Sequence, residues 1–522
     1  MTLPISPILL LLLLLLFSSP LTTPTTTTRV EEDVETANSA CSDTLHRELC
    51  LSTLSTFPNL ASQTLPQIIS ATVNHTVDEV ESSAANCSGI KSHFRNRLDP
   101  IQKRALEDCL ELFQYTIAEL HSALKHIPPA KSPKTRDSRR RFDDLETLLS
   151  GAITNQYTCL DGFAYGDHDE HVRKLIEKRL YKISHLEGST VDRGYSSGNV
   201  TGYDAVVAKD GSGNYSTIGE AVEAAPSESK ERFVIYVKAG AYLENVEVGR
   251  KKTNLMFKGD GIEKTVVKGS RNVVDGWTTF RSATVAVVGN GFIASDMTFE
   301  NSAGPSKHQA VALRSGADLS AFYRCSFVGY QDTLYVHSLR QFYKNVIYMA
   351  RLISSLEMQL QRCKIAIYML GDQILIKETY SLLKEGKTRI KTRGFQSSAA
   401  KLPPQQDLIP VMPSFETYLG RPWKEYSRTV FIRAKMDDVV NPKGWLEWDG
   451  EFALKTLYYG EYMNRGPGSN TSGRVTWPGY RVLNTTEASA FTVEAFIQGS
   501  DWLPAINIPY APGLNLSSQI RI

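Results

Sequence analysis

The chain has 522 residues, a hydrophobic fraction of 42% and a formal net charge of +2 at pH 7. A chain of this length exceeds one ordinary domain, so we expect two or more domains with sizeable cores. The small net charge argues against a dedicated nucleic-acid binder, which would carry a clustered basic surface, and is compatible with an acidic polysaccharide partner.

The N-terminus carries a short apolar run, Ile8 to Phe17, dominated by the unbroken leucines Leu9–Leu16. Such a run fits a secretory signal peptide, which we place at residues 1–23, and is too short for a membrane span; an uncleaved anchor is the alternative. Because the chain has 7 cysteines, at least one is free or joined to another chain. Secretion would permit N-glycosylation at the N-x-S/T sequons: Asn74, Asn86, Asn199, Asn214, Asn470, Asn484 and Asn515.

Residues 38–187 have a helical pattern, in which apolar residues recur at spacings of three and four. A basic, proline-containing loop at residues 128–141 separates two long segments, so the pattern favours an up-and-down helical bundle. Cys87 has no evident partner. Spacing alone leaves three pairings open among the other cysteines of this region: Cys41, Cys50, Cys109 and Cys159.

Residues 188–202 contain glycine, serine and few bulky side chains, which predicts a linker. From residue 203 to residue 515, short β-rich runs such as Phe233–Lys238 and Thr265–Gly269 recur between Gly, Asn and Asp. Few hairpin signals flank these runs, so a parallel β-helix is favoured over a sandwich. The chain is therefore predicted to be an α + β multidomain protein.

The hexapeptide Tyr330–Tyr335 places an amide, Gln331, beside a carboxyl group, Asp332. The run alternates large and polar side chains and is predicted to be a short strand. On a strand, these two side chains point to opposite faces unless a turn or bulge redirects one. An acid that protonates a leaving alcohol and an amide that binds an oxyanion suit the cleavage of a carboxylic ester.

Two further stretches supply groups of the same kind: His308–Arg314, which contains Gln309, and Tyr418–Trp423, which contains Arg421. An arginine can orient a carboxylate, and the tryptophan can support a sugar ring. In a stacked β architecture, consecutive turns bring distant residues into one groove. We expect one such groove to contain Gln309, Gln331, Asp332 and Arg421.

These three stretches, with Gly444–Trp448 and Leu457–Tyr462, resemble the motifs of plant pectin methylesterases in the family's order. The resemblance extends from Tyr203 to Leu514 and implies a right-handed parallel β-helix. It implies removal of methyl esters from cell-wall pectin (homogalacturonan) to give pectate and methanol, with no metal or other cofactor. The helical region resembles the plant invertase and pectin methylesterase inhibitor domain, which implies the disulfides Cys41–Cys50 and Cys109–Cys159.

The same resemblance implies a protein secreted to the cell wall or apoplast. The expected partners are methyl-esterified pectin and its own or other inhibitor domains, with no nucleic acid and, after signal removal, no membrane. Asp332 matches the acid/base that protonates departing methanol and then activates water, and Gln331 matches the stabiliser of the transition state. The remaining matches are Gln309 as a second amide donor, Arg421 as the cation that orients the nucleophile, Trp423 as the sugar platform and Thr279 as a substrate contact.

The family's nucleophile motif, Gly-Thr-Val-Asp-Phe-Ile-Phe-Gly-Asn, should follow Asp332 and is absent. The chain instead has Met349–Met358, and no Asp occurs between Asp332 and Asp372. These residues can be encoded as atg gca cgg ttg att tca tct ttg gaa atg. The same bases read from the third position encode the missing motif, and the Asp codon then spans Leu352 and Ile353.

A second window, Ile374–Arg393, behaves in the same way. Shifted equally and read with permitted codons, it gives Pro-Asn-Gln-Arg-Asn-Ile-Leu-Thr-Ala-Gln-Gly-Arg-Lys-Asp-Pro-Asn-Gln-Asn-Thr-Gly, which is close to the family's sequence here. Residues 352–393 also lack proline and contain only Gly371 and Gly386, unlike solenoid turns. We therefore interpret residues 345–393 as displaced from the native reading frame. The alternatives are a catalytically inactive pectin-binding or inhibitor protein and a non-enzymatic structural wall protein.

Overall fold

The computed structural model describes residues 29–42, 47–128, 136–163, 174, 176, 202–350, 370–377, 396–398, 401–402, 418–438 and 440–514. The signal peptide predicted at residues 1–23 and nearly all of the predicted linker lie outside these ranges. The described residues form two compact units, a helical unit within Met1–Asp192 and a strand-rich unit that starts at Gly202. Of the described helices, none combines the length and apolar character needed to cross a membrane.

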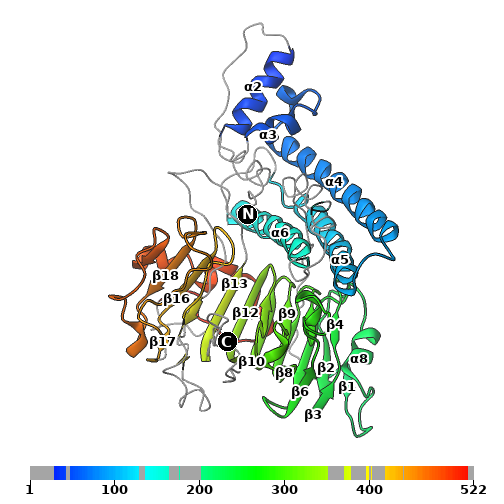
Figure 1. Cartoon of the computed structure of the whole chain (residues 1–522), viewed down its shortest axis with the longest axis vertical. Coiled ribbons are helices and arrows are strands. Elements are labelled where there is room, and N and C mark those ends of the chain that lie inside the picture. The colour runs from blue at the N-terminus through cyan, green and yellow to red at the C-terminus, as the bar shows by residue number, and fades with distance from the viewer. Residues whose placement is uncertain are drawn as a thin grey trace. The chain divides into compact units, whose positions relative to one another are not determined.

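In the helical unit, α4 packs on α5 and α5 packs on α6 (Figure 1). Both α4 and α5 begin with a capping box and a proline in the first turn; at α5, the Asp99 carboxylate accepts the Gln102 N–H at 2.8 Å. The third long helix begins at Arg136, so the loop predicted at residues 128–141 is shorter than expected. The helices are α2 (Arg29–Cys41), α3 (Arg47–Leu54), η1 (Leu60–Ser62), α4 (Leu65–His93), α5 (Pro100–Ala123) and α6 (Arg136–Asp161).

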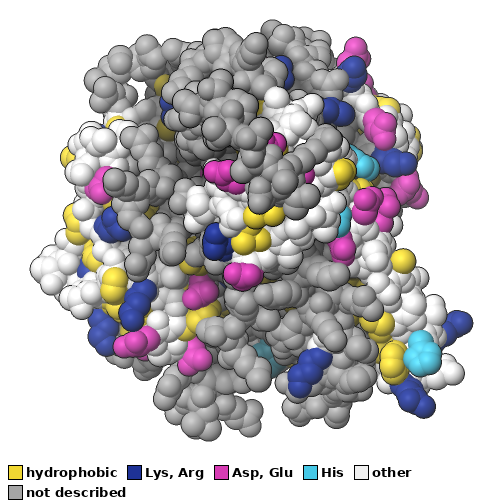
Figure 2. Space-filling model, turned by 90° about the horizontal axis from the view of Figure 1, so that it is seen from above, with side chains coloured by type: hydrophobic (Ala, Val, Ile, Leu, Met, Phe, Trp, Pro, Cys, Tyr) yellow, Lys and Arg dark blue, Asp and Glu magenta, His cyan; other side chains and the backbone are white. Residues whose placement is uncertain are grey.

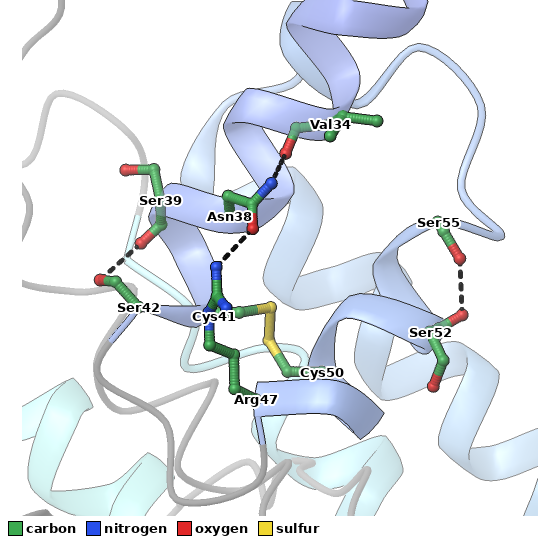
Figure 3. The surroundings of a disulfide bond; sticks show 9 residues. All are labelled: Val34, Asn38, Ser39, Cys41, Ser42, Arg47, Cys50, Ser52 and Ser55. Carbon is green, nitrogen blue, oxygen red and sulfur yellow. Dashed lines mark hydrogen bonds between the residues drawn. A yellow bond between two sulfur atoms is a disulfide. The ribbon is translucent and has the colours of Figure 1, made fainter.

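Two disulfides join helices of this unit, Cys41–Cys50 between α2 and α3 and Cys109–Cys159 between α5 and α6. Beside the Cys41–Cys50 disulfide, Arg47 Nη2 donates to Asn38 Oδ1 at 2.6 Å (Figure 3). This charge-assisted hydrogen bond also joins α2 to α3. The thiol of Cys87 is free and buried. The pairing is the one that the resemblance implied.

The strand-rich unit consists of short strands connected by turns. Their bounds follow in chain order, with the short helices among them: β1 (Ala205–Val207), α8 (Ile218–Ala224), β2 (Phe233–Val237), β3 (Gly240–Leu243), β4 (Val246–Val248), β5 (Leu255–Gly259), β6 (Thr265–Gly269), η2 (Phe280–Ser282), β7 (Val285–Val287), β8 (Ile293–Asn301), η3 (Pro305–Lys307), β9 (Leu313–Ser315), β10 (Ser320–Gly329), β11 (Leu334–Val336), β12 (Arg340–Ala350), β13 (Leu370–Lys377), β14 (Gln396–Ser398), β15 (Lys401–Leu402), β16 (Arg428–Ile432), β17 (Lys435–Met436), β18 (Tyr458–Tyr462), η6 (Pro467–Ser469), β19 (Tyr480–Val482), α9 (Thr485–Ser489), α10 (Val493–Ile497), η7 (Gly499–Asp501) and η8 (Leu503–Ile506).

Successive turns pair in parallel and in register. One sheet runs β1-β2-β5-β8-β10-β12 and continues into β13, and a second runs β11-β9-β7-β4 (Figure 1). The core between them holds rows of like side chains, because parallel register places equivalent residues above one another. Phe322 and Tyr343, for example, stack with ring centroids 4.8 Å apart.

One strand departs from this pattern. Among the described strands, every pairing is parallel except the three made by β13, which is antiparallel to β12, β14 and β15. β13 lies inside residues 345–393, the segment that the sequence pattern marks as displaced from its frame.

A second apolar cluster lies on the other face of the large sheet. It joins Ala321 of β10 and Phe342 of β12 to Phe496 and Trp502 near the C-terminus. A buried ion pair reinforces the same junction, because Arg340 Nη2 lies 2.6 Å from Asp318 Oδ2 while its Nη1 donates to Gln498 Oε1 at 3.1 Å. Elsewhere, on the face that Figure 2 shows, acidic and basic side chains are interspersed among the described residues.

Candidate active site

Gln309 and Gln331 lie side by side on neighbouring turns. They form an isolated parallel bridge, in which the N–H of Ala310 donates to the Gln331 carbonyl at 3.1 Å. Both residues are half-buried. The Gln331 Oε1 atom is buried and makes no hydrogen bond with the described residues. The pairing that stacked turns were expected to produce is therefore present for the two amides.

The backbone beside each amide is in the left-handed region. His308, before Gln309, has φ 56°, and Asp332, after Gln331, has φ 58°. Non-glycine residues rarely adopt such values, and they cluster at functional sites. The prediction of a strand over Tyr330–Tyr335 is wrong for most of that run, since β11 begins at Leu334. The left-handed backbone at Asp332 therefore interrupts the alternation of faces that a strand would impose.

The Asp332 side chain is exposed to solvent and makes no hydrogen bond or ion pair with the described residues. The protein around it nevertheless removes water from the carboxyl group, and this desolvation alone raises its pKa to about 6. Burial likewise raises the pKa of the neighbouring Tyr348 to about 12, helped by the Asp332 charge. A carboxyl group with this pKa can hold a proton near pH 6 and pass it to a leaving alkoxide.

Thr279 lies at the start of η2, in the segment between β6 and β7. Its hydroxyl oxygen is buried and has no hydrogen-bond partner in the part of the chain that the structure describes. The segment is tied to the glutamine pair, because the N–H of Val273 donates to the Gln309 carbonyl at 3.1 Å. The structure thus brings Thr279's segment, Gln309, Gln331 and Asp332 together.

Arg421 and Trp423 lie in the segment that precedes β16. The Arg421 guanidinium donates from Nε to the Glu447 carbonyl at 2.9 Å and from Nη2 to the Trp448 carbonyl at 3.1 Å, and it lies 4.7 Å above the Trp448 ring. Trp423 is 38% exposed, which leaves ring surface available to a sugar. No hydrogen bond, ion pair or ring contact within the described residues joins Arg421 to Gln331 or Asp332.

Arg314 is a group to which the sequence pattern gave no role. It is 3% exposed, its guanidinium carbon lies 3.5 Å from the centroid of Phe280, and its Nε and Nη1 atoms have no hydrogen-bond partner. In the sheet register, it sits between Ala286 and Tyr335. The ring face partly compensates the buried charge.

Comparisons with known proteins decide the family. Residues 204–500 match the family described as Pectinesterase, and residues 35–187 match the one described as Plant invertase/pectin methylesterase inhibitor. The chain belongs to the pectinesterase family. It is 43% identical to Pectinesterase 1 of Citrus sinensis, over 91% of this chain and 88% of the relative, and 41% identical to Pectinesterase/pectinesterase inhibitor U1 of Solanum lycopersicum, over 91% and 88%.

Among solved structures, the pectin methylesterase from carrot is 47% identical, with a TM-score of 0.54. The similarity covers 61% of this chain and 100% of the carrot chain. The strand-rich unit therefore has a pectinesterase fold.

Two of the motifs shared with pectinesterases have structural roles here. In Gly444–Trp448, Trp445 is fully buried and stacks on Tyr459 with centroids 4.2 Å apart. In Leu457–Tyr462, Glu461 is 1% exposed and accepts from Arg474 Nε at 2.8 Å. Burial in the core accounts for Trp445 and Glu461, whereas Glu447 and Trp448 of the first motif hold Arg421.

The segment where this pectinesterase should carry its nucleophile, around Leu352 and Ile353, lies outside the described residues. Within the described residues, desolvation is the only cause of the raised Asp332 pKa.

Proposed function

We propose that this protein is a pectin methylesterase, a carboxylic ester hydrolase that converts methyl-esterified homogalacturonan to pectate and methanol. The observation that carries the proposal is the paired register of Gln309 and Gln331 beside Asp332, whose pKa is raised to about 6. Membership of the pectinesterase family supports the same reaction.

In the proposed reaction, a carboxylate nucleophile attacks the C6 carbonyl carbon of a galacturonate methyl ester. The amide N–H groups of Gln309 and Gln331 bind the oxyanion that forms. When the C–O bond to the methoxy group breaks, Asp332 donates its proton and methanol leaves. Asp332 then takes a proton from the water that hydrolyses the acyl-enzyme, which frees pectate and the nucleophile.

Arg421 and Trp423 have more peripheral roles in this proposal. The Arg421 guanidinium is fixed by two carbonyls and the Trp448 ring, so it can present its remaining N–H groups to the nucleophile without reorganising. Trp423 offers an exposed ring to a sugar. Thr279 contacts the substrate through the segment that borders Gln309.

The proposal includes the finer architecture. The parallel sheets belong to a right-handed β-helix over residues 203–515, and the helices form an up-and-down bundle over residues 38–187, behind a signal peptide at residues 1–23. The protein acts in the cell wall, and its partners are methyl-esterified pectin and its own or other inhibitor domains. The match of residues 35–187 to the inhibitor family supports the last point.

We further propose that residues 345–393 are written out of frame. Two windows recover family sequence under the same shift, and β13 within this segment makes the antiparallel pairings of an otherwise parallel set of described strands. Both relatives carry pectinesterase in their names, which favours the esterase over an inactive pectin-binding or inhibitor protein.

The test compares two full-length chains for methanol release from methyl-esterified pectin. The chain as written should release no methanol above background, and the chain with both windows restored should be active. Changing only the restored Asp to Ala should abolish activity again, which identifies the nucleophile. Genomic and transcript sequence across codons 343–394 tests the frame directly. Activity of the chain as written would contradict both the frame displacement and the two-aspartate mechanism.

A further inference from the structure

The side chain of Asn301, at the end of β8, lies where three parts of the strand-rich unit meet. It is 1% exposed, and its Nδ2 donates to the carbonyls of Arg271 at 2.9 Å, Val311 at 3.1 Å and Ser282 at 3.3 Å. Arg271 and Ser282 are the two ends of the segment that contains Thr279. One amide therefore holds both ends of this segment against the residues that follow Gln309.

The hydroxyl group of Ser282 makes a second connection. It is fully buried, accepts the N–H of Val311 at 3.1 Å and donates to the carbonyl of Thr279 at 2.8 Å. Because Val311 lies two residues after Gln309, this chain of two hydrogen bonds fixes the backbone of Thr279 relative to the glutamine pair. No catalytic step uses Ser282 or Asn301, and a buried, fully bonded network of this kind gives a site a single geometry.

We propose that Ser282 and Asn301 are positioning residues of the active site, which set the distance between Thr279 and Gln309 and thereby the affinity for the esterified sugar chain. The proposal rests on the proposed function. It concerns how this chain places its substrate contact, and it assigns neither residue to the chemical step.

The experiment uses the full-length chain in the form that releases methanol, with a methyl-esterified oligogalacturonide as substrate. Ser282→Ala should raise KM roughly tenfold, because it leaves the Val311 N–H unpaired and holds the Thr279 carbonyl by only the longer backbone bond from the N–H of residue 282, at 3.3 Å. It should change kcat less than about threefold, since the groups that act in the transition state remain. Ser282→Cys, which keeps the size but weakens both hydrogen bonds, should shift KM in the same direction and serves if Ser282→Ala does not fold.

A matched control is available in Thr265, on β6. Its hydroxyl is also fully buried, accepts one backbone N–H (Asp260, 3.0 Å) and donates to one carbonyl (Val237, 3.1 Å). Thr265→Val should therefore lower the urea midpoint about as much as Ser282→Ala while leaving KM unchanged. A double-mutant cycle measures the coupling between two substitutions, which a general loss of stability would not produce. Ser282→Ala and Thr279→Val should be strongly non-additive, whereas Thr265→Val and Thr279→Val should be additive.

An equal KM shift in Thr265→Val, or additive effects of Ser282→Ala and Thr279→Val, would overturn the positioning role while leaving the esterase assignment intact. Failure of both the written and the restored parent chains to release methanol would instead overturn the proposed function, and this inference with it.

Discussion

A Cβ atom at Gly444 would lie 2.3 Å from Arg474 Cδ, so the side chain of Arg474 occupies the space that any other residue at position 444 would need. The backbone of Gly444 has φ +70°, which also favours glycine. This close approach lets Arg474 reach Glu461 inside the core.

The Glu461–Arg474 pair gives a stability prediction. Both side chains are 1% exposed, and the other Glu461 oxygen accepts from Asn464 at 3.2 Å, so the carboxylate is fully bonded. Glu461→Gln should lower the free energy of unfolding by about 3–5 kcal/mol, because it leaves a buried guanidinium without its countercharge. Asp437→Asn, which breaks the long, partly exposed pair with Lys435, should cost less than about 1 kcal/mol.

Urea unfolding followed by tryptophan fluorescence compares the free energies of unfolding of the two variants and reports on the strand-rich unit. The chain has 6 tryptophans, and all of them lie between residues 277 and 502. Similar costs for Glu461→Gln and Asp437→Asn would mean that the buried pair does not stabilise the fold.

Asp332 and Gln331 give an activity prediction in the restored chain. Asp332→Asn keeps the shape but removes the proton donor, so methanol release should fall about 10²–10⁴-fold. Gln331→Ala should cost roughly 10²–10³-fold if its amide binds the oxyanion. Unfolding midpoints close to the parent's should accompany both losses, and near-normal rates in either variant would falsify the assigned role.

Asp332 also gives a pH prediction. Its folded pKa of about 6 lies above the ordinary value of 3.8, so the native state binds the proton more tightly. Its contribution to stability is then fully present below about pH 4 and is lost as the pH rises through about 6. The parent should therefore lose stability relative to Asp332→Asn between pH 4 and pH 6. Asp210, whose pKa is lowered by its bonds to Ser212, provides the control: Asp210→Asn should show no such difference in this interval.

The free thiols give a reactivity prediction. Burial raises the pKa of both Cys87 and Cys325 to about 12, so neither forms appreciable thiolate at pH 8. Neither should be alkylated by iodoacetamide in the native protein, and both should react once it is unfolded. Peptide mapping without reduction should recover Cys41–Cys50 and Cys109–Cys159; a peptide that joins Cys87 to one of these four would contradict the structure.

Much of this arrangement could be predicted from the sequence because it depends on local patterns. The run Thr265–Gly269 is a strand with the predicted bounds, and the spacing of Ala105, Cys109 and Leu112 identifies a buried helical face. The register of Gln309 with Gln331 also follows from motif spacing once the turns are assumed to stack in parallel.

Other features depend on contacts between distant residues and leave little trace in the sequence. The strand pattern of Tyr330–Tyr335 does not show the left-handed backbone of Asp332. In the sequence, Arg314 has no feature that distinguishes it from an exposed basic residue. Only the fold places the ring of Phe280, from another turn, over its guanidinium group. The sequence likewise does not predict the hydrogen bonds of the Ser282 hydroxyl group.

The hydrogen bond from Arg340 to Gln498 joins residues separated by 158 positions. Together with the cluster that packs Phe496 and Trp502 against Phe342, it fastens the end of the chain directly to β10 and β12, without passing through the residues between them. The C-terminal described residues therefore stay attached to β10 and β12 through contacts that do not depend on an intact chain between them. A protease cut anywhere between residues 351 and 417 should yield two fragments that stay associated and copurify. The two halves, produced as separate polypeptides, should likewise associate into one folded unit.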